Sequence, residues 1–359
     1  MKIGVLTGGG DAPGLNAVIR AIVKSSKVKY NCEVIGIEEG FDGLLSPVKV
    51  RPMTPWTIRG ILPTGGTVLG TTSTINPMEM TKKIDGKEQQ VDLSGELKKN
   101  VEELGLSGLI VIGGDGTLKI ADNLYRMGVP TIGIPKTIDN DIPATDVTFG
   151  FQTAVNTATE ALDKLHTTAE SHHRVIVVEL MGRYVGWIAL EAGIAGGADV
   201  ILIPEIPFQI DQVCKKIVAR YEQGSRFSIV VVAEGAKPLG GEMSVIKRSE
   251  TGYALRLGGI GNKVGEEIGS CTKMDVRVTV LGHIQRGGSP TPYDRILATR
   301  FGVAAMDLFA QGRFGEMVCL KGDEICSVPL SEATRGLKFV PADGEMVRAA
   351  EALGISFGR

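Results

Sequence analysis

The chain has 359 residues, which is too long for one ordinary core and fits two domains. Its 39 lysines and arginines nearly balance 41 aspartates and glutamates, so overall charge directs it neither to nucleic acid nor to an anionic membrane. No apolar run reaches the ~20 residues that span a bilayer, and the opening MKIGVLTGGG predicts a strand rather than a signal peptide, so we expect a cytoplasmic protein.

Short β-branched runs that end near glycines alternate with helical periods along the chain. The predicted strands cover residues 3–6, 109–112, 131–134, 175–180, 200–203, 228–233 and 276–281. The predicted helices cover residues 14–24, 93–104, 117–127, 152–168 and 211–222. Continuous apolar runs are typical of buried parallel strands. The order of elements predicts the α/β class, with a doubly wound sheet in each domain and ligands beyond the carboxyl ends of the strands.

A polar segment, the glycine content and the cysteines add to this alternating pattern of strands and helices. Residues 77–94 are polar and show no clear period, so we expect a surface excursion there. The 48 glycines indicate many tight turns and close backbone approaches. Without a C-x-x-C pair, the cysteines are expected to be buried or free thiols rather than a disulfide framework. They are Cys32, Cys214, Cys271, Cys319 and Cys326.

The first glycine-rich turn, GGGDAPG at residues 8–14, joins a predicted strand to a predicted helix. Glycines at such a turn let several backbone N–H groups approach an anion at the helix N-terminus. Pro13 takes the place of the third glycine of a dinucleotide fingerprint, and the chain contains no Walker sequence. The turn therefore predicts a phosphate contact, with a plain tight turn as the alternative.

The second turn, GGDGT at residues 113–117, also follows a strand and opens a helix. It adds the carboxylate of Asp115, which can hold Mg²⁺ against phosphate oxygens. NAD kinases and lipid kinases have a similar turn, so the motif indicates phosphoryl transfer without fixing the substrate. A purely structural turn is the alternative.

The third motif, PKTIDND at residues 135–141, crowds acidic residues beside a lysine after a predicted strand. Asp139 can accept a proton from an attacking hydroxyl, and Lys136 can offset charge on the transferred group. Asp141 can support a metal or orient the site. A surface turn with solvated charges is the alternative.

Three later strands also end in polar or glycine-rich turns, at residues 181–183, 233–235 and 281–288. Guanidinium groups match phosphate geometry, although a surface ion pair is the alternative for each arginine. The candidates are Arg174, Arg183, Arg277 and Arg286. The histidines show no metal-ligand spacing, and we assign no metal to them.

Taken in order, these motifs resemble the phosphofructokinase family over residues 1 to about 310. The matching segments are GGGDAPG, GGDGT, PKTIDND, SHHRVIVVELMGR, AEGA and VTVLGHIQRGGSPTPYDRILATRFG. The resemblance implies transfer of the γ-phosphoryl group of ATP to the 1-hydroxyl of fructose 6-phosphate, in glycolysis. It implies two Rossmann-like domains with the active site in the cleft between them. Residues 1–150 plus about 285–335 would bind the donor, and residues 151–284 plus about 336–359 would bind the sugar phosphate.

The resemblance also assigns roles to single residues. Asp139 would be the base, Arg183 would stabilise the transferring group, and Lys136 and Thr137 would complete the catalytic set. Mg²⁺ would bind Asp115. The donor would contact Gly10, Ser73, Gly114, Asp115, Gly116 and Thr117. Fructose 6-phosphate would contact Thr137, Ile138, Asp139, Met181, Gly182, Arg183, Glu234, His283, Ile284, Gln285 and Arg286. Arg174 and Arg277 would reach in from a neighbouring subunit of a homodimer or homotetramer.

Two residues point to different phosphoryl donors. Lys136 is typical of the pyrophosphate-dependent and mixed-donor branches, and the segment at residues 69–73 lacks the arginine that bacterial ATP enzymes carry near Ser73. Pyrophosphate enzymes place aspartate at the position of Gly116, where its charge excludes the nucleotide α-phosphate. An aspartate carboxylate would repel the nucleotide α-phosphate directly, whereas lysine is compatible with either donor. Because this chain has glycine at position 116, ATP is favoured and pyrophosphate is the alternative.

The sequence also bears on regulation and on two alternative functions. Pro55 and His166 stand where regulated bacterial enzymes have arginines, so we expect weak or absent control by ADP or phosphoenolpyruvate. A kinase for another phosphorylated acceptor would share the GGDGT turn. A non-catalytic sugar-phosphate sensor usually loses its base or metal ligand, and here Asp115, Asp139 and Asp141 are all present.

Overall fold

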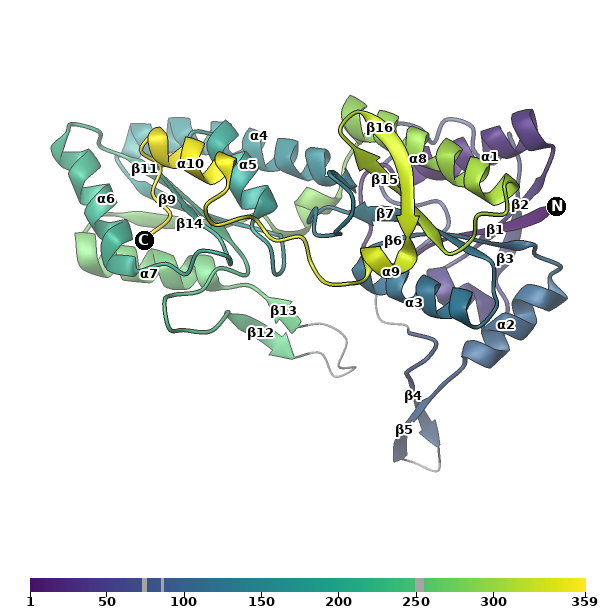
Figure 1. The fold of residues 1–359 in the computed structure, drawn as a ribbon. Helices are drawn as coiled ribbons and strands as arrows, with labels where there is room; N and C mark the ends of the chain where they lie inside the picture. Colours follow the sequence, from purple (N-terminus) through teal and green to yellow (C-terminus); the bar gives the residue numbers. More distant parts are fainter. Residues whose placement is uncertain (73–75, 85–86, 249–254) are drawn as a thin grey trace. The chain divides into compact units, whose positions relative to one another are not determined.

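The computed structural model describes residues 1–72, 76–84, 87–248 and 255–359, which form two compact units (Figure 1). Unit 1 comprises residues 1–137, 141–152 and 286–337. Unit 2 comprises residues 138–140, 153–285 and 338–359. No helix in the described ranges is long and apolar enough to cross a membrane.

Unit 1 is built on a mainly parallel sheet with the strand order β16-β15-β7-β6-β1-β2-β3, and β8 pairs with β7. The inner strands run parallel, whereas β3 and β16 are antiparallel to their neighbours. The strands are β1 (Lys2–Thr7), β2 (Glu33–Ile37), β3 (Val50–Met53), β6 (Gly108–Gly113), β7 (Thr131–Thr137), β8 (Phe149–Gly150), β15 (Glu316–Lys321) and β16 (Glu324–Pro329). The carboxyl ends of β1, β6 and β7 therefore lie at one edge of the sheet, where the three predicted turns begin.

Helices cover both faces of this sheet (Figure 1). One layer consists of α1 (Leu15–Ser25) and α8 (Pro292–Ala310), and the other of α2 (Ser94–Glu103), α3 (Asp115–Arg126) and α9 (Leu330–Ala333). Side chains alternate along a strand, so Ile110 and Ile112 pack into the first layer while Leu109 and Val111 pack into the second. Burial on both faces explains the unbroken apolar run of β6.

Residues 77–94 contain regular structure that the sequence did not predict. An antiparallel hairpin of β4 (Met80–Ile84) and β5 (Lys87–Val91) occupies the excursion. Its strands form a two-stranded sheet of their own and do not join the large sheet. The polar composition did not indicate β4 and β5, because a two-stranded ribbon of this kind needs no apolar face to bury.

Unit 2 is built on a parallel sheet with the strand order β10-β11-β9-β14. Its strands are β9 (Val175–Leu180), β10 (Val200–Leu202), β11 (Ser228–Ala233) and β14 (Val276–Val280). Figure 1 shows α6 (Ile210–Glu222) and α7 (Ile260–Thr272) on one face, and α4 (Phe151–His172), α5 (Trp187–Ala195) and α10 (Glu345–Ala352) on the other. Strands β12 (Val245–Arg248) and β13 (Leu255–Leu257) pair to form a small antiparallel ribbon. Both sheets confirm the predicted α/β class.

Two predictions in this unit are wrong. The strand at residues 276–281 is not buried, because β14 is an edge strand that pairs only with β9 among the described residues, and Val280 is 51% exposed. Cys214 and Cys271 are not free thiols, because a disulfide joins them. They are 57 residues apart in the chain, but α6 and α7, which carry them, pack against each other. Cys32, Cys319 and Cys326 are free as expected.

Candidate active site

In unit 1, the first two predicted turns pack against each other beyond β1 and β6. The amide of Gly8 donates to the Ile112 carbonyl at 2.9 Å, which ties the two strand ends together. Thr117 fills the space between the turns: a Cβ on Gly8 would lie 2.7 Å from its Cγ2, and one on Gly113 would lie 2.3 Å from its Cβ. Larger residues would separate the turns, so the glycines are required by packing.

The N-terminus of α3 lies at this edge. The helix begins at Asp115 directly after β6, with Gly114 as its N-cap in an extended conformation. Asp115 is half-buried and Gly116 is exposed. A Cβ on Gly116 would meet no heavy atom of the described residues within 4 Å. The backbone N–H groups and the positive end of the helix dipole favour a bound anion here, and the space beside Gly116 is open.

Two cations contact the backbone of the first turn. Lys136, which is buried near the end of β7, donates from Nζ to the Gly10 carbonyl. Arg286 donates from Nη1 to the Asp11 carbonyl at 3.2 Å, and a Cβ on Gly10 would lie 2.8 Å from that Nη1 atom. Positive charge from Lys136 and Arg286 therefore lies beside the first glycine-rich turn, where it favours a bound phosphate.

In unit 2, the predicted base Asp139 lies near Glu234, which follows β11. Glu234 in turn contacts residues 181–183 after β9, which we call the arginine turn. Asp139 is 3% exposed. The Arg183 amide donates to Glu234 Oε1 at 3.0 Å. The pKa of the Glu234 carboxyl is raised to about 7, mainly by burial; the hydrogen bond from the Arg183 amide lowers it, and the negative charge of Asp139 adds to the rise. The structure thus brings three predicted site residues together.

The backbone of the arginine turn leaves little freedom. Arg183 has φ +50°, in the left-handed region that non-glycine residues rarely adopt. A Cβ on Gly182 would lie 2.6 Å from the Val185 carbonyl oxygen, and one on Gly235 would lie 2.0 Å from the Arg183 carbonyl oxygen. The two strand ends are therefore interlocked, and strain of this kind is typical of functional sites.

The comparison with known proteins agrees with this geometry. The family model described as phosphofructokinase matches residues 2–309. The chain belongs to the phosphofructokinase family. This confirms the resemblance drawn from the six motifs.

Similar proteins of the family carry two kinds of name. A Chloroflexus aurantiacus protein named ATP-dependent 6-phosphofructokinase is 54% identical over 99% of this chain and 98% of its own length. A Streptomyces coelicolor protein named pyrophosphate–fructose 6-phosphate 1-phosphotransferase is 51% identical over the full length of both chains. Overall identity therefore does not separate the two donors.

Solved structures of the family share the fold. Phosphofructokinase from Saccharomyces cerevisiae superposes with a TM-score of 0.79 at 32% identity, and the match covers 93% of this chain but only 45% of the yeast chain. The pyrophosphate-dependent phosphofructokinase from Nitrosospira multiformis has a TM-score of 0.81 at 19% identity, covering 99% of this chain and 92% of the other. The predicted fold of two Rossmann-like domains is confirmed.

Arg174 and Arg277, the residues that the family resemblance assigns to a neighbouring subunit, meet at one carboxylate. Arg174 donates from Nε to Asp275 Oδ2 at 2.6 Å, and Arg277 donates from Nη1 to Oδ1 of the same residue. The hydrogen bond from Arg174 and the charge of Arg277 lower the pKa of Asp275. Both arginines lie on the surface of unit 2 at the amino ends of β9 and β14.

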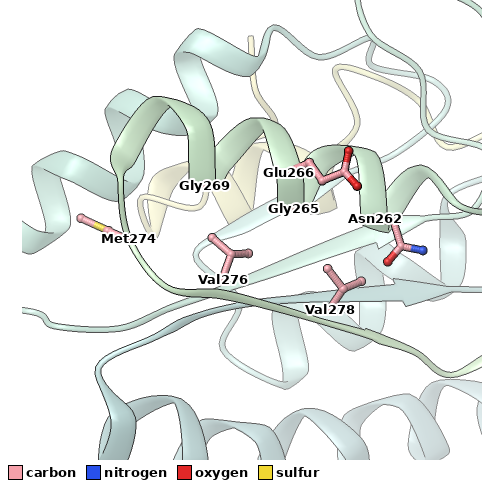
Figure 2. A pocket seen from close by; sticks show the side chains of 7 residues that line it. All are labelled: Asn262, Gly265, Glu266, Gly269, Met274, Val276 and Val278. Atoms are coloured by element: carbon pink, nitrogen blue, oxygen red, sulfur yellow. The ribbon is translucent and has the colours of Figure 1, made fainter.

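A hollow of about 270 Å³ lies between α7 and the exposed edge strand β14 (Figure 2). Its walls are mainly apolar or glycine, with a carboxylate and an amide toward one end of α7. The lining residues are Asn262, Gly265, Glu266, Gly269, Met274, Val276 and Val278. Val278 is the one lining residue that belongs to the six motifs, and it lies on the strand rather than in a turn, so the hollow belongs to the β14 surface.

The remaining predicted residues differ in exposure. His283 and Ile284 are exposed in a short 3₁₀ helix (Gly282–Arg286), whereas Gln285 is fully buried and donates from Nε2 to the Gly282 carbonyl at 3.1 Å. Ser73 lies outside the described residues. Thr137 and Ile138 are buried and Met181 is half-buried. Their contacts with ligands stay predictions.

Sequence reasoning missed a residue of the chain's last segment. Lys338 donates from Nζ to Asn140 Oδ1 at 2.9 Å, next to Asp139. The two residues are 198 positions apart, and no motif surrounds the lysine. It also missed Thr71, which donates from Oγ1 to the Gly9 carbonyl at 2.6 Å and supports the first turn.

Proposed function

We propose that the chain is an ATP-dependent 6-phosphofructokinase. It transfers the γ-phosphoryl group of ATP to the 1-hydroxyl of fructose 6-phosphate and yields ADP and fructose 1,6-bisphosphate. The observation that carries the proposal is the grouping of the buried Asp139 with the half-buried Arg183 and Glu234 in unit 2 of a chain that belongs to this family. A cytoplasmic location is part of the same proposal.

In this reaction Asp139 acts as the general base. The oxygen of the 1-hydroxyl forms a bond to the γ-phosphorus while the bond from that phosphorus to the β,γ-bridging oxygen breaks, and the hydroxyl proton passes to Asp139. Arg183 stabilises the charge on the transferring group. Lys136 and the N-terminus of α3 offset the charge of the donor phosphates.

We place Mg²⁺ at Asp115. Its half-buried carboxylate follows the strand end at the anion-favouring edge of unit 1, and Mg²⁺ usually binds one or two carboxylates together with substrate phosphates and water. When bound, the ion neutralises phosphate charge. Asp115→Asn should raise the Mg²⁺ concentration that gives half-maximal rate, without changing the melting temperature.

The open space at Gly116 supports ATP as the donor. ATP is larger than pyrophosphate and needs room for its α-phosphate and nucleoside. A Cβ at position 116 would meet no heavy atom of the described residues within 4 Å, so this space is open. Lys136 contacts the Gly10 carbonyl, where it can serve either donor. The test is the initial rate with fructose 6-phosphate and Mg²⁺, with ATP and pyrophosphate at equal concentrations. A clear ATP preference supports the proposal, and a pyrophosphate preference contradicts it.

We also propose a homo-oligomer in which Arg174 and Arg277 serve the sugar-phosphate site of a neighbouring subunit. The exposed edge of β14 and the hollow beside α7 support an interface on this side of unit 2. Both arginines lie on that side with solvent-accessible side chains. Sedimentation velocity tests the association, and a monomer that retains full activity would contradict it.

A further inference from the structure

The segment at residues 338–340 is fastened to the start of α5 within unit 2. Trp187 donates from its indole Nε1 to the Lys338 carbonyl at 2.8 Å. Glu205 accepts at Oε1 from the amide of Gly186 at 3.0 Å and from the amide of Val340 at 2.9 Å. One carboxylate oxygen and one indole thus bind both the late segment and the residues that follow the arginine turn.

The side chain of Lys338 extends from this anchor to the predicted catalytic segment. Its Nζ lies 5.7 Å from the centroid of the Trp187 ring and donates to Asn140 Oδ1 at 2.9 Å. A cation over an indole face is attracted by the ring, and the stem of a half-buried lysine packs against the same surface. The ammonium is therefore held at one place rather than sampling solvent.

The residue that Lys338 binds has a constrained backbone. Asn140 is 4% exposed and has φ +54°, in the left-handed region. Asparagine tolerates that region better than most residues, but the conformation persists only where surrounding contacts determine it. The hydrogen bond from Lys338 is such a contact. Asn140 follows Asp139 directly, so its conformation is part of the backbone that carries the Asp139 carboxylate.

We propose that Lys338 is a positioning residue for phosphoryl transfer. It holds the side chain of Asn140 and, through that residue, the backbone that presents Asp139, while Trp187 fixes Lys338. The inference rests on the proposed function, in which Asp139 is the base. It assigns a catalytic purpose to a segment beyond the residues matched by the family model, which end at residue 309.

The experiment is a double-mutant cycle between Lys338 and Asn140. Lys338→Met keeps the length of the stem and removes the ammonium, and Asn140→Gly removes the acceptor but permits positive φ. A small misplacement of a base costs on the order of tenfold to a hundredfold in rate, so Lys338→Met should lower kcat by that factor and leave the KM for ATP unchanged. In the Asn140→Gly background the same substitution should have no further effect.

Three controls separate positioning from general stability. Lys164→Met removes an exposed lysine of the same unit and should leave kcat unchanged. Lys338→Arg should recover most of the lost kcat, because guanidinium can donate to Asn140 and stack on Trp187. Trp56 is 77% exposed, so a Trp56→Phe background leaves Trp187 as the sole tryptophan, and Lys338→Met should change its emission when tryptophan is excited selectively.

The outcomes distinguish this inference from the proposed function. If Asp139→Asn abolishes turnover but Lys338→Met keeps the wild-type kcat, the positioning role is wrong and the function stands. Additive effects in the cycle, or an unchanged Trp187 emission, also overturn the role. If Asp139→Asn itself retains full turnover, the assigned base is wrong whatever Lys338 does.

Discussion

The raised pKa of Glu234 makes the stability of the protein depend on pH in a calculable way. Burial and the charge of Asp139 raise this pKa from 4.5 to about 7. At about 1.4 kcal/mol for each tenfold change in the acid constant, the difference corresponds to about 3 kcal/mol. Because the folded state holds the proton more tightly than the unfolded chain, this stability is present below about pH 4.5. It is lost as the pH rises to about 7.

The substitution Glu234→Gln removes this titration and keeps the shape of the side chain. Relative to wild type, the variant should gain up to about 3 kcal/mol in free energy of unfolding between about pH 5 and about pH 8. Urea unfolding of both proteins without substrate, at one protein concentration, measures the difference. Glu222→Gln, which removes an exposed carboxylate of the same unit, should show no such gain. A constant difference between Glu234→Gln and wild type across the range would refute the reasoning.

The remaining predictions concern the donor, the interface and the interlocked turns. Gly116→Asp adds a carboxylate in open space, so kcat/KM for ATP should fall by at least about a hundredfold with an unchanged melting temperature; unaltered ATP kinetics would show that the donor phosphates lie elsewhere. Mixed oligomers of Asp139→Asn and Arg277→Ala chains should regain activity that neither variant has, because one site then carries no defect; failure to recover activity after subunit exchange would argue against a shared site. Gly235→Ala places a Cβ 2.0 Å from the Arg183 carbonyl oxygen and should cost about 1–3 kcal/mol in urea unfolding, whereas wild-type stability would mean that the turn can relax.

Features that leave a local pattern in the chain could be predicted from the sequence. The run Leu109 to Ile112 is apolar at every position because β6 is covered on both faces, and that pattern is visible in the letters. The turns beside Thr117 require glycine for packing, so the glycines of the GGDGT motif indicate a close approach of the backbone. The grouping of Asp139, Arg183 and Glu234 followed from their common place at strand ends together with the family resemblance.

The parts that the sequence did not predict depend on distant segments. The segment Val276–Val280 alternates valine with Arg277 and Thr279, a pattern that the prediction of a buried strand overlooked, and the strand order shows that β14 is an edge. The disulfide between Cys214 and Cys271 depends on the packing of two helices that lack a shared motif. The contact of Lys338 with Asn140 spans 198 positions, and nothing in the residues that flank this lysine indicates its partner.

The central claim is that this chain phosphorylates fructose 6-phosphate with Asp139 as the base. The most direct measurement is the rate of fructose 1,6-bisphosphate formation from fructose 6-phosphate and MgATP by the wild-type protein and by Asp139→Asn. We predict steady turnover by the wild type. In the variant, kcat should fall on the order of a hundredfold to ten-thousandfold, with a modest change in KM. A variant that turns over at the wild-type rate would contradict the mechanism, and a wild-type protein that forms no bisphosphate would contradict the function.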